Sequence, residues 1–298
     1  MRSVILPFPD NAETALSLAK RLDAEMGAVT LRRFPDGETY VRIETPVTGR
    51  ETILVCTLSR PDEKMLPLLL TAATAKDLGA TRVGLVAPYL AYMRQDARFQ
   101  PGEGITSRYI ARLLSQAVDW LVTVDPHLHR YRSLAEVYSV PTRVVRAAPL
   151  IAQWIRNHVS SPVVVGPDGE SAQWAQVVAD EAGAPSVVLN KTRRGDRDVE
   201  VSFPDAERWK GYTPVVVDDL ISTAHTMIET VGHVKRAGLP APICVAVHAV
   251  FAERAYADLV AAGPARVLTC NTVPHASNGL DATDLLADGV QEIRMAQG

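Results

Sequence analysis

Two adjacent carboxylates, Asp218 and Asp219, follow three valines in the segment Val215–Thr226 (VVVDDLISTAHT). The loop after them carries three hydroxyl side chains, those of Ser222, Thr223 and Thr226. Ligands of open parallel sheets bind at the carboxyl ends of strands, and the first N–H groups of a helix bind anions. Carboxylates beside such an anion cradle suit a ligand with both a diol and a phosphate, although a simple polar strand end with an N-cap is an equal alternative.

A second segment, Asn190–Asp205 (NKTRRGDRDVEVSFPD), gathers basic side chains around a glycine, namely Lys191, Arg193, Arg194 and Arg197. Cations stabilise the charge that spreads over the oxygens of a transferring phosphoryl group. We interpret the segment as a mobile loop that closes over a phosphorylated substrate, with Lys191 and Arg193 stabilising the transition state. The plainer alternative is a solvated basic hairpin, because most charge runs are exposed faces.

Common nucleotide signatures are missing from the chain. It has no Gly-Lys dipeptide, so the P-loop motif is absent, and the only G-x-G, Gly102–Gly104, does not lie directly between a strand and a helix. These absences argue against a Walker site and against a Rossmann dinucleotide site. Neither H-E-x-x-H nor G-x-S-x-G occurs.

The composition is that of a globular protein. The 298 residues include 31 Lys and Arg against 34 Asp and Glu, a net charge of −3, with 47% hydrophobic and 22% charged residues. These values exclude a disordered chain, a collagen-like chain and a disulfide scaffold. The near-neutral charge argues against a nucleic-acid partner, and no tract approaches the ~20 apolar residues of a membrane span. Three cysteines without C-x-x-C spacing indicate a cytoplasmic protein without a zinc site.

Short β-branched runs alternate with helical patterns along the chain. The strands are expected at Thr52–Thr57, Arg82–Ala87, Leu121–Val124, Pro162–Val165, Ser186–Leu189, Val215–Val217 and Ile243–Val247. The helices are expected at Asn11–Met26, Met65–Leu78, Thr106–Ala117, Ala172–Glu181 and Thr226–Ala237, with C-caps at Gly27, Gly79, Gly183 and Gly238. Strands that are apolar on both faces predict parallel sheets covered on two sides.

The order of strand, polar loop and helix runs twice, at VGLVAPYLAYMRQD…ITSRYIARLL and at PVVVDDLISTAHTMIETVGHVKRAG. We therefore expect an α/β protein made of two duplicated domains, each with a mainly parallel sheet flanked by helices. The predicted division falls near Arg143–Leu150 and separates residues 1–145 from residues 146–298.

The segment Val215–Thr226 resembles the phosphoribosyl-diphosphate binding loop of type I phosphoribosyltransferase folds, and most of all the version in ribose-phosphate pyrophosphokinases (PRPP synthetases). Five further segments resemble that family in the same order, namely Phe34–Glu38 (FPDGE), Pro88–Asp96 (PYLAYMRQD), Val124–His127 (VDPH), Gly166–Asp168 (GPD) and Lys191–Arg193 (KTR). Each match is weak alone, but six matches in order are specific.

The resemblance implies two phosphoribosyltransferase-like domains, residues 1–145 on the ATP side and residues 146–298 on the ribose 5-phosphate side, with a catalytic loop at 190–205. It implies transfer of the diphosphoryl group of Mg-ATP to the 1-hydroxyl of ribose 5-phosphate, giving PRPP and AMP. It also implies Mg²⁺ as cofactor, and a homo-oligomer of at least two subunits in which a neighbouring subunit donates the adenine side of the ATP site.

The resemblance also implies roles for individual residues. Lys191 and Arg193 are the expected catalytic cations, and His127 and Asp168 the expected metal residues. The ATP site would include Phe34, Asp36, Glu38, Arg94, Gln95, Asp96 and His127. The ribose 5-phosphate site would include Asp218, Asp219, Ser222, Thr223, Ala224, His225 and Thr226.

The chain departs from the family pattern at three places. Gly169 is followed by Glu170 where the family has a second glycine, and Ala224-His225 replaces the glycine pair of the phosphate loop, which restricts the backbone there. The segment after Asp96 lacks the Ser/Arg-rich stretch that many bacterial members use in regulation. Two alternatives stay open: a non-catalytic regulatory paralogue, and a phosphoribosyltransferase that consumes PRPP.

Overall fold

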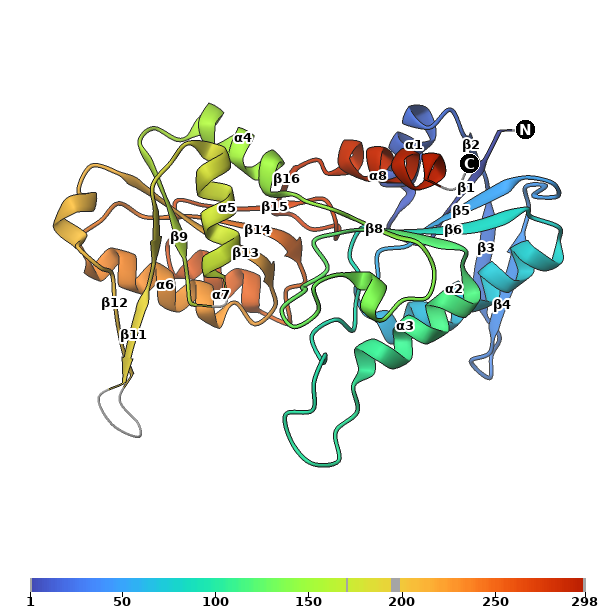
Figure 1. The fold of residues 1–298 in the computed structure, drawn as a ribbon, viewed down its shortest axis with the longest axis horizontal. Helices are drawn as coiled ribbons and strands as arrows, with labels where there is room; N and C mark the ends of the chain where they lie inside the picture. Colours follow the sequence, from blue (N-terminus) through green and yellow to red (C-terminus); the bar gives the residue numbers. More distant parts are fainter. Residues whose placement is uncertain (1, 170, 194–198, 297–298) are drawn as a thin grey trace. The chain divides into compact units, whose positions relative to one another are not determined.

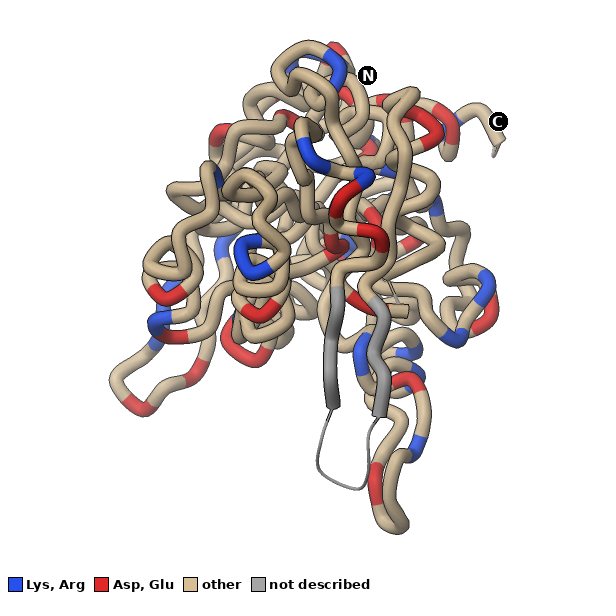
Figure 2. The backbone as a smooth tube through the Cα atoms, turned by 90° about the vertical axis from the view of Figure 1, so that its left-hand side faces the viewer, with Lys and Arg blue, Asp and Glu red and all other residues tan. Residues whose placement is uncertain are grey.

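The chain divides into two α/β units (Figure 1). The first unit comprises Met1–Arg146 with Ala282–Gly298, and the second comprises Ala147–Asp281. The computed structural model describes residues 2–169, 171–193 and 199–296, and the side chains of these residues except 190–193 and 199–202. Among the helices so described, none is long and apolar enough to cross a membrane. Basic and acidic residues are interspersed along the backbone in the view of Figure 2.

The first unit is built on a six-stranded sheet in the order β2-β1-β5-β6-β7-β8, and all its pairings are parallel. Its strands are β1 (Val4–Pro7), β2 (Glu25–Met26), β5 (Glu51–Val55), β6 (Arg82–Ala87), β7 (Trp120–Val124) and β8 (Thr142–Val145). Its helices are α1 (Ala12–Arg21), α2 (Pro61–Asp77), α3 (Thr106–Ala117) and α8 (Thr283–Met295), with a 3-10 turn at Leu134–Glu136. An antiparallel hairpin, β3 (Val29–Arg33) and β4 (Thr39–Ile43), lies against α2.

Each face of this sheet is covered by two helices, which is why its strands are apolar on both sides. Buried side chains of α2 and α3, such as Leu68 and Leu114, join a core with Leu54 and Leu85 of the sheet. Helices α1 and α8 contact each other, and α8 also contacts β7 and β8. Figure 1 shows α1 and α8 on the face opposite α2 and α3.

The terminal helix α8 therefore belongs to the first unit, whereas the sequence pattern assigned all of 146–298 to one domain. The reason is close packing at Gly289, where an added Cβ would come within 2.8 Å of the side chains of Val122 and Val145. Arg294 of α8 also donates from Nε to Glu51 at 2.9 Å. A helical pattern predicts a helix, but it does not say which sheet the helix covers.

The second unit repeats the architecture with the sheet order β10-β9-β13-β14-β15-β16, again with parallel pairings. Its strands are β9 (Pro162–Gly166), β10 (Ser186–Val188), β13 (Thr213–Ile221), β14 (Ile243–Ala249), β15 (Arg266–Cys270) and β16 (Asn278–Leu280). Its helices are α4 (Ala148–His158), α5 (Ala172–Ala182), α6 (His225–Arg236) and α7 (Ala255–Ala261), with a 3-10 turn at Ala206–Trp209. A separate antiparallel hairpin joins β11 (Asn190–Arg193) to β12 (Val199–Ser202).

Helices α6 and α7 contact each other and share a core with alternate residues of β9, β13 and β14. Met227 and Val231 of α6 are buried there with Val165 and Val216. Helices α4 and α5 also contact each other, and α5 contacts β9 and β13. The second sheet is thus covered by two pairs of helices, and the predicted α/β class with two parallel sheets is confirmed.

The expected strands and helices all occur, but many of their boundaries differ, and α2 begins at Pro61 instead of Met65. The first helix ends at Arg21 instead of Met26, because Glu25 and Met26 pair with β1 and the N–H of Gly27 donates to Ile5 O at 2.8 Å. The other three predicted caps, Gly79, Gly183 and Gly238, follow their helices with φ of 86°, 66° and 73°. Strand β13 continues to Ile221, through both aspartates.

Candidate functional site

Asp218 and Asp219 lie in the last part of β13, next to the end of β9 where Asp168 follows the strand. Burial raises the pKa of Asp218 well above its ordinary value, and the negative charges of Asp219 and Asp168 raise it further. The N–H of Asp219 donates to Asp218 Oδ1 at 3.0 Å, which opposes the rise. Three carboxylates that repel one another at the carboxyl edge of a sheet favour a bound cation or a hydroxyl-rich ligand.

Asp168 is fixed by the beginning of α5. Its Oδ1 accepts a hydrogen bond from Ser171 N at 3.0 Å, and its carbonyl accepts one from Ser171 Oγ at 3.0 Å. An added Cβ on Gly169 would meet nothing within 4 Å, so the backbone beside Asp168 is open. Glu170, the departure from the family pattern, lies outside the described residues.

The loop Ser222–Ala224 joins β13 to α6, which begins at His225. Ala224 has φ of 61°, a left-handed conformation that favours glycine, and its carbonyl accepts the helical bond from Ile228 N at 2.9 Å. The carbonyl of Ser222 is held by Ala252 N at 3.1 Å. The loop therefore makes a left-handed turn with an alanine, not a glycine, in the position that costs free energy.

This loop presents polar groups at the N-terminus of α6. Thr223 and His225 are exposed, and Ser222 and Thr226 are half-buried. Hydroxyls beside the first N–H groups of a helix form an anion cradle, because those N–H groups have no intrahelical acceptor. The predicted sugar-phosphate residues are thus brought together on one edge of the second sheet.

The predicted catalytic segment forms the hairpin of β11 and β12. Its backbone register places Lys191 opposite Val201 and Arg193 opposite Val199. Arg194 and Arg197 lie outside the described residues, as do the side chains of Lys191 and Arg193. The backbone is that of a two-stranded ribbon which extends from the second unit (Figure 1).

In the first unit, Arg94, Gln95 and Asp96 lie in the long loop between β6 and α3. Arg94 is exposed, whereas the side chain of Asp96 is only 2% exposed and accepts a hydrogen bond from Arg130 Nη1 at 2.8 Å. Gln95 Oε1 accepts from Thr106 Oγ1 at 3.1 Å, which ties the loop to the start of α3. Of the three predicted residues, Arg94 alone faces solvent.

His127 follows β7 at the carboxyl edge of the first sheet, and its ring lies against that of His129, with the centroids 4.0 Å apart. The backbone there is unusual, because Asp125 has φ of 29° and His127 has φ of 51°. His127 is half-buried and His129 is exposed. Imidazole nitrogens at a strand end can bind a metal ion or a phosphate.

Phe34, Asp36 and Glu38 form the exposed turn of the β3–β4 hairpin. Phe34 is 39% exposed and makes an edge contact with Tyr40. Asp36 Oδ1 accepts from Glu38 N at 3.2 Å, so this carboxylate stabilises its own turn. An added Cβ on Gly37 would meet nothing within 4 Å, so the tip of the hairpin stands clear of neighbouring atoms.

Comparison with known proteins gives the family. Residues 3–117 match the N-terminal domain of ribose phosphate pyrophosphokinase, and residues 133–284 match the phosphoribosyl transferase domain. A ribose-phosphate pyrophosphokinase of Methanothermobacter thermautotrophicus is 34% identical over 290 residues, which cover 97% of this chain and 100% of that protein. The chain belongs to the ribose-phosphate pyrophosphokinase family. It is therefore a diphosphotransferase by family, as the six motifs predicted.

A second similar ribose-phosphate pyrophosphokinase, from Methanopyrus kandleri, is 32% identical over 293 residues, which cover 97% of this chain and 99% of that protein. The crystal structure of phosphoribosylpyrophosphate synthetase from Mycobacterium smegmatis has a TM-score of 0.87 and 27% identity, with full coverage of both chains. The fold of this pyrophosphokinase is thus shared over its whole length with a solved structure of the same family.

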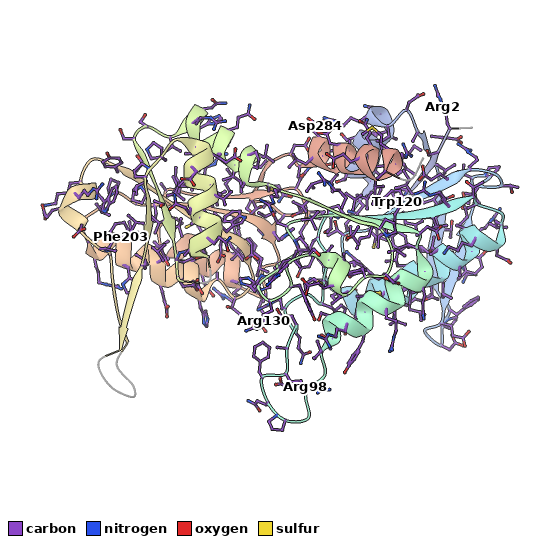
Figure 3. The ribbon with its side chains drawn as sticks, viewed as in Figure 1. Arg2, Arg98, Trp120, Arg130, Phe203 and Asp284 are labelled. Atoms are coloured by element: carbon purple, nitrogen blue, oxygen red, sulfur yellow. The ribbon has the colours of Figure 1, made fainter. Side chains whose placement is uncertain are left out.

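Sequence reasoning missed two residues that pack around the predicted residues Arg94–Asp96. Arg130, labelled in Figure 3, pairs with the buried carboxylate of Asp96. Its guanidinium also lies 5.0 Å from the ring centre of Phe99. Phe99 is 59% exposed, and its N–H donates to Glu103 Oε2 at 2.7 Å. A buried aspartate in a polar loop predicts a basic partner, but the spacing of 34 residues gives no local signal of which one.

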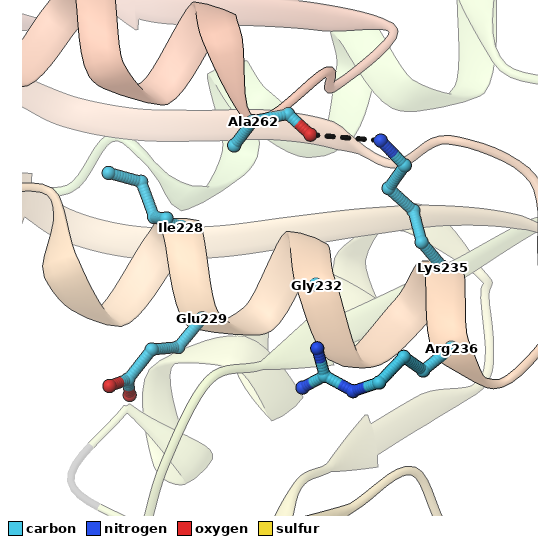
Figure 4. Close-up of a pocket in the computed structure, with 6 residues that line it drawn as sticks. All are labelled: Ile228, Glu229, Gly232, Lys235, Arg236 and Ala262. Carbon is cyan, nitrogen blue, oxygen red and sulfur yellow. Dashed lines mark hydrogen bonds between the residues drawn. The ribbon is translucent and has the colours of Figure 1, made fainter.

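A surface hollow of about 520 Å³ lies on α6 (Figure 4), and none of the residues that line it is a predicted site residue. It is lined by Ile228, Glu229, Gly232, Lys235, Arg236 and Ala262. Lys235 Nζ donates to the carbonyl of Ala262 at 3.0 Å, which satisfies the C-terminal end of α7. Arg236 Nη2 lies 2.8 Å from His233 Nδ1, and neither Lys235 nor Arg236 belongs to a predicted substrate site.

Proposed function

We propose that this ribose-phosphate pyrophosphokinase transfers the diphosphoryl group of Mg-ATP to the 1-hydroxyl of ribose 5-phosphate, giving PRPP and AMP. One observation carries the proposal: the crowded carboxylates around Asp218 lie beside the hydroxyl-rich loop Ser222–Ala224 on one sheet edge. Carboxylates accept hydrogen bonds from sugar hydroxyls, and the loop offers donors to a phosphate. A sugar phosphate satisfies both at once.

The sugar orientation follows from this arrangement. Asp218 and Asp219 accept hydrogen bonds from the ribose hydroxyls, while Ser222, Thr223 and Thr226 donate to the 5-phosphate. Ala224 and His225 complete the loop, and the exposed His225 adds a donor where the family has glycine. The chain thereby holds the acceptor hydroxyl in position for in-line attack, which is the main task of the protein in phosphoryl-type transfer.

ATP is proposed to bind through the exposed Arg94 and its neighbours Gln95 and Asp96, with His127 near the phosphates. Arg94 can grip a phosphate bidentately, and the Asp96–Arg130 pair holds the loop in place. Phe34, Asp36 and Glu38 are proposed as the adenine side, donated by a neighbouring subunit. The exposed, outward hairpin supports such a donation, and it requires a homo-oligomer of at least two subunits.

Mg²⁺ is the proposed cofactor, and the donor chemistry fits it. Asp168, Asp218 and Asp219 are oxygen donors whose mutual repulsion a divalent cation would relieve, and His127 is the proposed metal residue of the first unit. When bound, the ion neutralises charge on the transferring phosphates. Lys191 and Arg193 are proposed to stabilise the transition state from the hairpin. We also propose a cytoplasmic location, without a nucleic-acid or membrane partner.

The experiment is a product assay on the purified chain with Mg-ATP and a panel of pentose phosphates. AMP should form only when a pentose phosphate is present, with ribose 5-phosphate giving the highest kcat/KM and PRPP identified by ³¹P NMR. ATP binding without AMP from any pentose phosphate would instead indicate the regulatory paralogue. Release of diphosphate from PRPP and a free base would indicate the phosphoribosyltransferase.

A further inference from the structure

The loop after β7 brings two imidazole rings together. His129 Nε2 lies 3.1 Å from His127 Nδ1, and the ring planes are tilted by 57°. The two residues are separated only by Leu128, so both rings leave the same short stretch of backbone. A single polar loop of the first unit thus presents two nitrogen donors at one point.

The separation of these two nitrogens is the one that a metal ion requires. Zinc–imidazole bonds are about 2.0–2.1 Å long, so two nitrogens on one tetrahedral or octahedral ion lie roughly 2.9–3.4 Å apart. The 3.1 Å between His127 Nδ1 and His129 Nε2 falls in that range. A hydrogen bond gives a similar distance, with its proton on the line between the nitrogens. A divalent ion would lie off that line, so the two rings would turn until both lone pairs face the ion.

The backbone around the pair is fixed in an uncommon conformation. Asp125 and His127 both have positive φ, which costs free energy in residues other than glycine. Asp125 N donates to Val145 O at 3.1 Å, and His127 N donates to Asp125 O at 2.9 Å. Downstream, the buried Asp96 holds Arg130 at 2.8 Å. The loop is therefore held on both sides of the histidines, and strain of this kind is typical of binding sites.

We propose that His127 and His129 form a two-imidazole chelate for a divalent transition ion, and that His129 makes this chain favour Mn²⁺, Co²⁺, Ni²⁺ or Zn²⁺ over Mg²⁺ at the ATP phosphates. The second half of this inference rests on the proposed function. Mg²⁺ prefers oxygen ligands, whereas imidazole suits transition ions, so a second imidazole raises the affinity for them selectively. Waters and phosphate oxygens complete the coordination.

The first test is metal binding by the full chain without nucleotide, measured by calorimetry with Co²⁺ and with Mg²⁺. His129→Asn should weaken Co²⁺ binding at least tenfold and move the Mg²⁺ affinity by less than threefold. His158→Asn is the matched control, because His158 is an exposed histidine at the end of α4 whose ring stacks on Trp154. Paramagnetic Co²⁺ should also broaden the NMR signals of His127 and His129 before those of His158.

The second test compares AMP formation with each ion. The ratio of kcat/KM with Mn²⁺ to that with Mg²⁺ should fall at least fivefold in His129→Asn and stay constant in His158→Asn. Equal Co²⁺ isotherms for wild type and His129→Asn, or an equal loss in His158→Asn, would overturn the chelate. Failure of AMP formation with every ion, with Co²⁺ binding intact, would instead overturn the proposed function and leave the chelate standing.

Discussion

The buried carboxylates at the carboxyl edges of the two sheets have different surroundings. In the first unit, Asp96 is almost fully buried and is paired with Arg130 at 2.8 Å. In the second unit, Asp218 lies beside Asp219 and Asp168, and like charges and burial raise its pKa. At the first edge an arginine pairs with the buried carboxylate, whereas at the second edge burial and neighbouring carboxylates raise the pKa of Asp218.

The difference indicates how each edge binds. A compensated edge is rigid before ligand arrives and can offer its exposed Arg94 to an anion without reorganisation. An edge with repelling carboxylates is destabilised until a cation or sugar hydroxyls arrive, so ligand binding and stability are linked there. Substitutions at the two edges should therefore have opposite effects on the stability of the ligand-free protein.

The largest expected effect is on catalysis and lies outside both edges, in the β11–β12 hairpin. Lys191→Ala should lower kcat roughly 10²–10³-fold, because it removes a cation that acts in the transition state. The KM for ATP should change by less than threefold. Lys210→Ala is the control, since Lys210 forms only an exposed pair with Glu207. An equal loss of kcat in Lys191→Ala and Lys210→Ala would contradict the proposed role of the hairpin in stabilising the transition state.

The second prediction tests the edge of the second sheet, where the pKa of Asp218 is raised. Asp218→Asn should raise the KM for ribose 5-phosphate at least tenfold while raising the Tm of the ligand-free protein at pH 7. The raised pKa means that the folded state binds more protons than the unfolded state, so stability falls as the pH rises above the ordinary value of 3.8. Asparagine removes the cost of ionising a buried carboxylate at position 218. Calorimetric Tm values of both proteins from pH 4 to pH 8 measure this cost.

Further measurements and a control variant test this interpretation of Asp218→Asn. The wild-type Tm should decline with pH more steeply than that of Asp218→Asn, and Mg²⁺ with ribose 5-phosphate should narrow the gap between them. Asp258→Asn, at an exposed carboxylate on α7, should leave both the Tm and the KM in place. A lower Tm for Asp218→Asn at pH 7 would show that a partner in the protein already compensates this charge.

The third prediction tests the compensated edge and has the opposite sign. Arg130→Ala should lower the free energy of unfolding by about 1–2 kcal/mol, because it leaves the buried Asp96 without its partner; the exposed half of Arg130 limits the loss. Urea unfolding measures it, with Arg254→Ala on the exposed α7 pair as control. Stability equal to wild type would mean that the two edges do not differ.

The comparison also explains how far the sequence could be used. Strand β13 and its aspartates were predictable, because a run of valines followed by acidic residues is a local pattern. The partnership of Asp96 with Arg130 was not, because it joins two loops 34 residues apart. The placement of α8 depends on the fit of Gly289 against Val122 and Val145, which no periodicity encodes.

The same distinction applies within a single loop. The alanine at position 224, where the family has glycine, was visible in the sequence, but the backbone conformation that it adopts was not. In the structure Ala224 is left-handed, with φ of 61°. The hydrogen bonds from Ile228 N to Ala224 O and from Ala252 N to Ser222 O hold the loop against the cost of that conformation.

The smallest predicted effect follows from this turn. Ala224→Gly removes a left-handed penalty of about 1–2 kcal/mol, while the greater freedom of glycine in the unfolded chain costs about 0.4–1 kcal/mol, so the free energy of unfolding should rise by about 0–1.6 kcal/mol. The KM for ribose 5-phosphate should fall two- to threefold, because the backbone can approach the phosphate more closely. Ala237→Gly, at the right-handed C-cap of the same helix, should only destabilise. If Ala224→Gly destabilises as much as Ala237→Gly does, the turn carries no strain, and an unchanged KM for ribose 5-phosphate would show that the alanine does not affect sugar-phosphate binding.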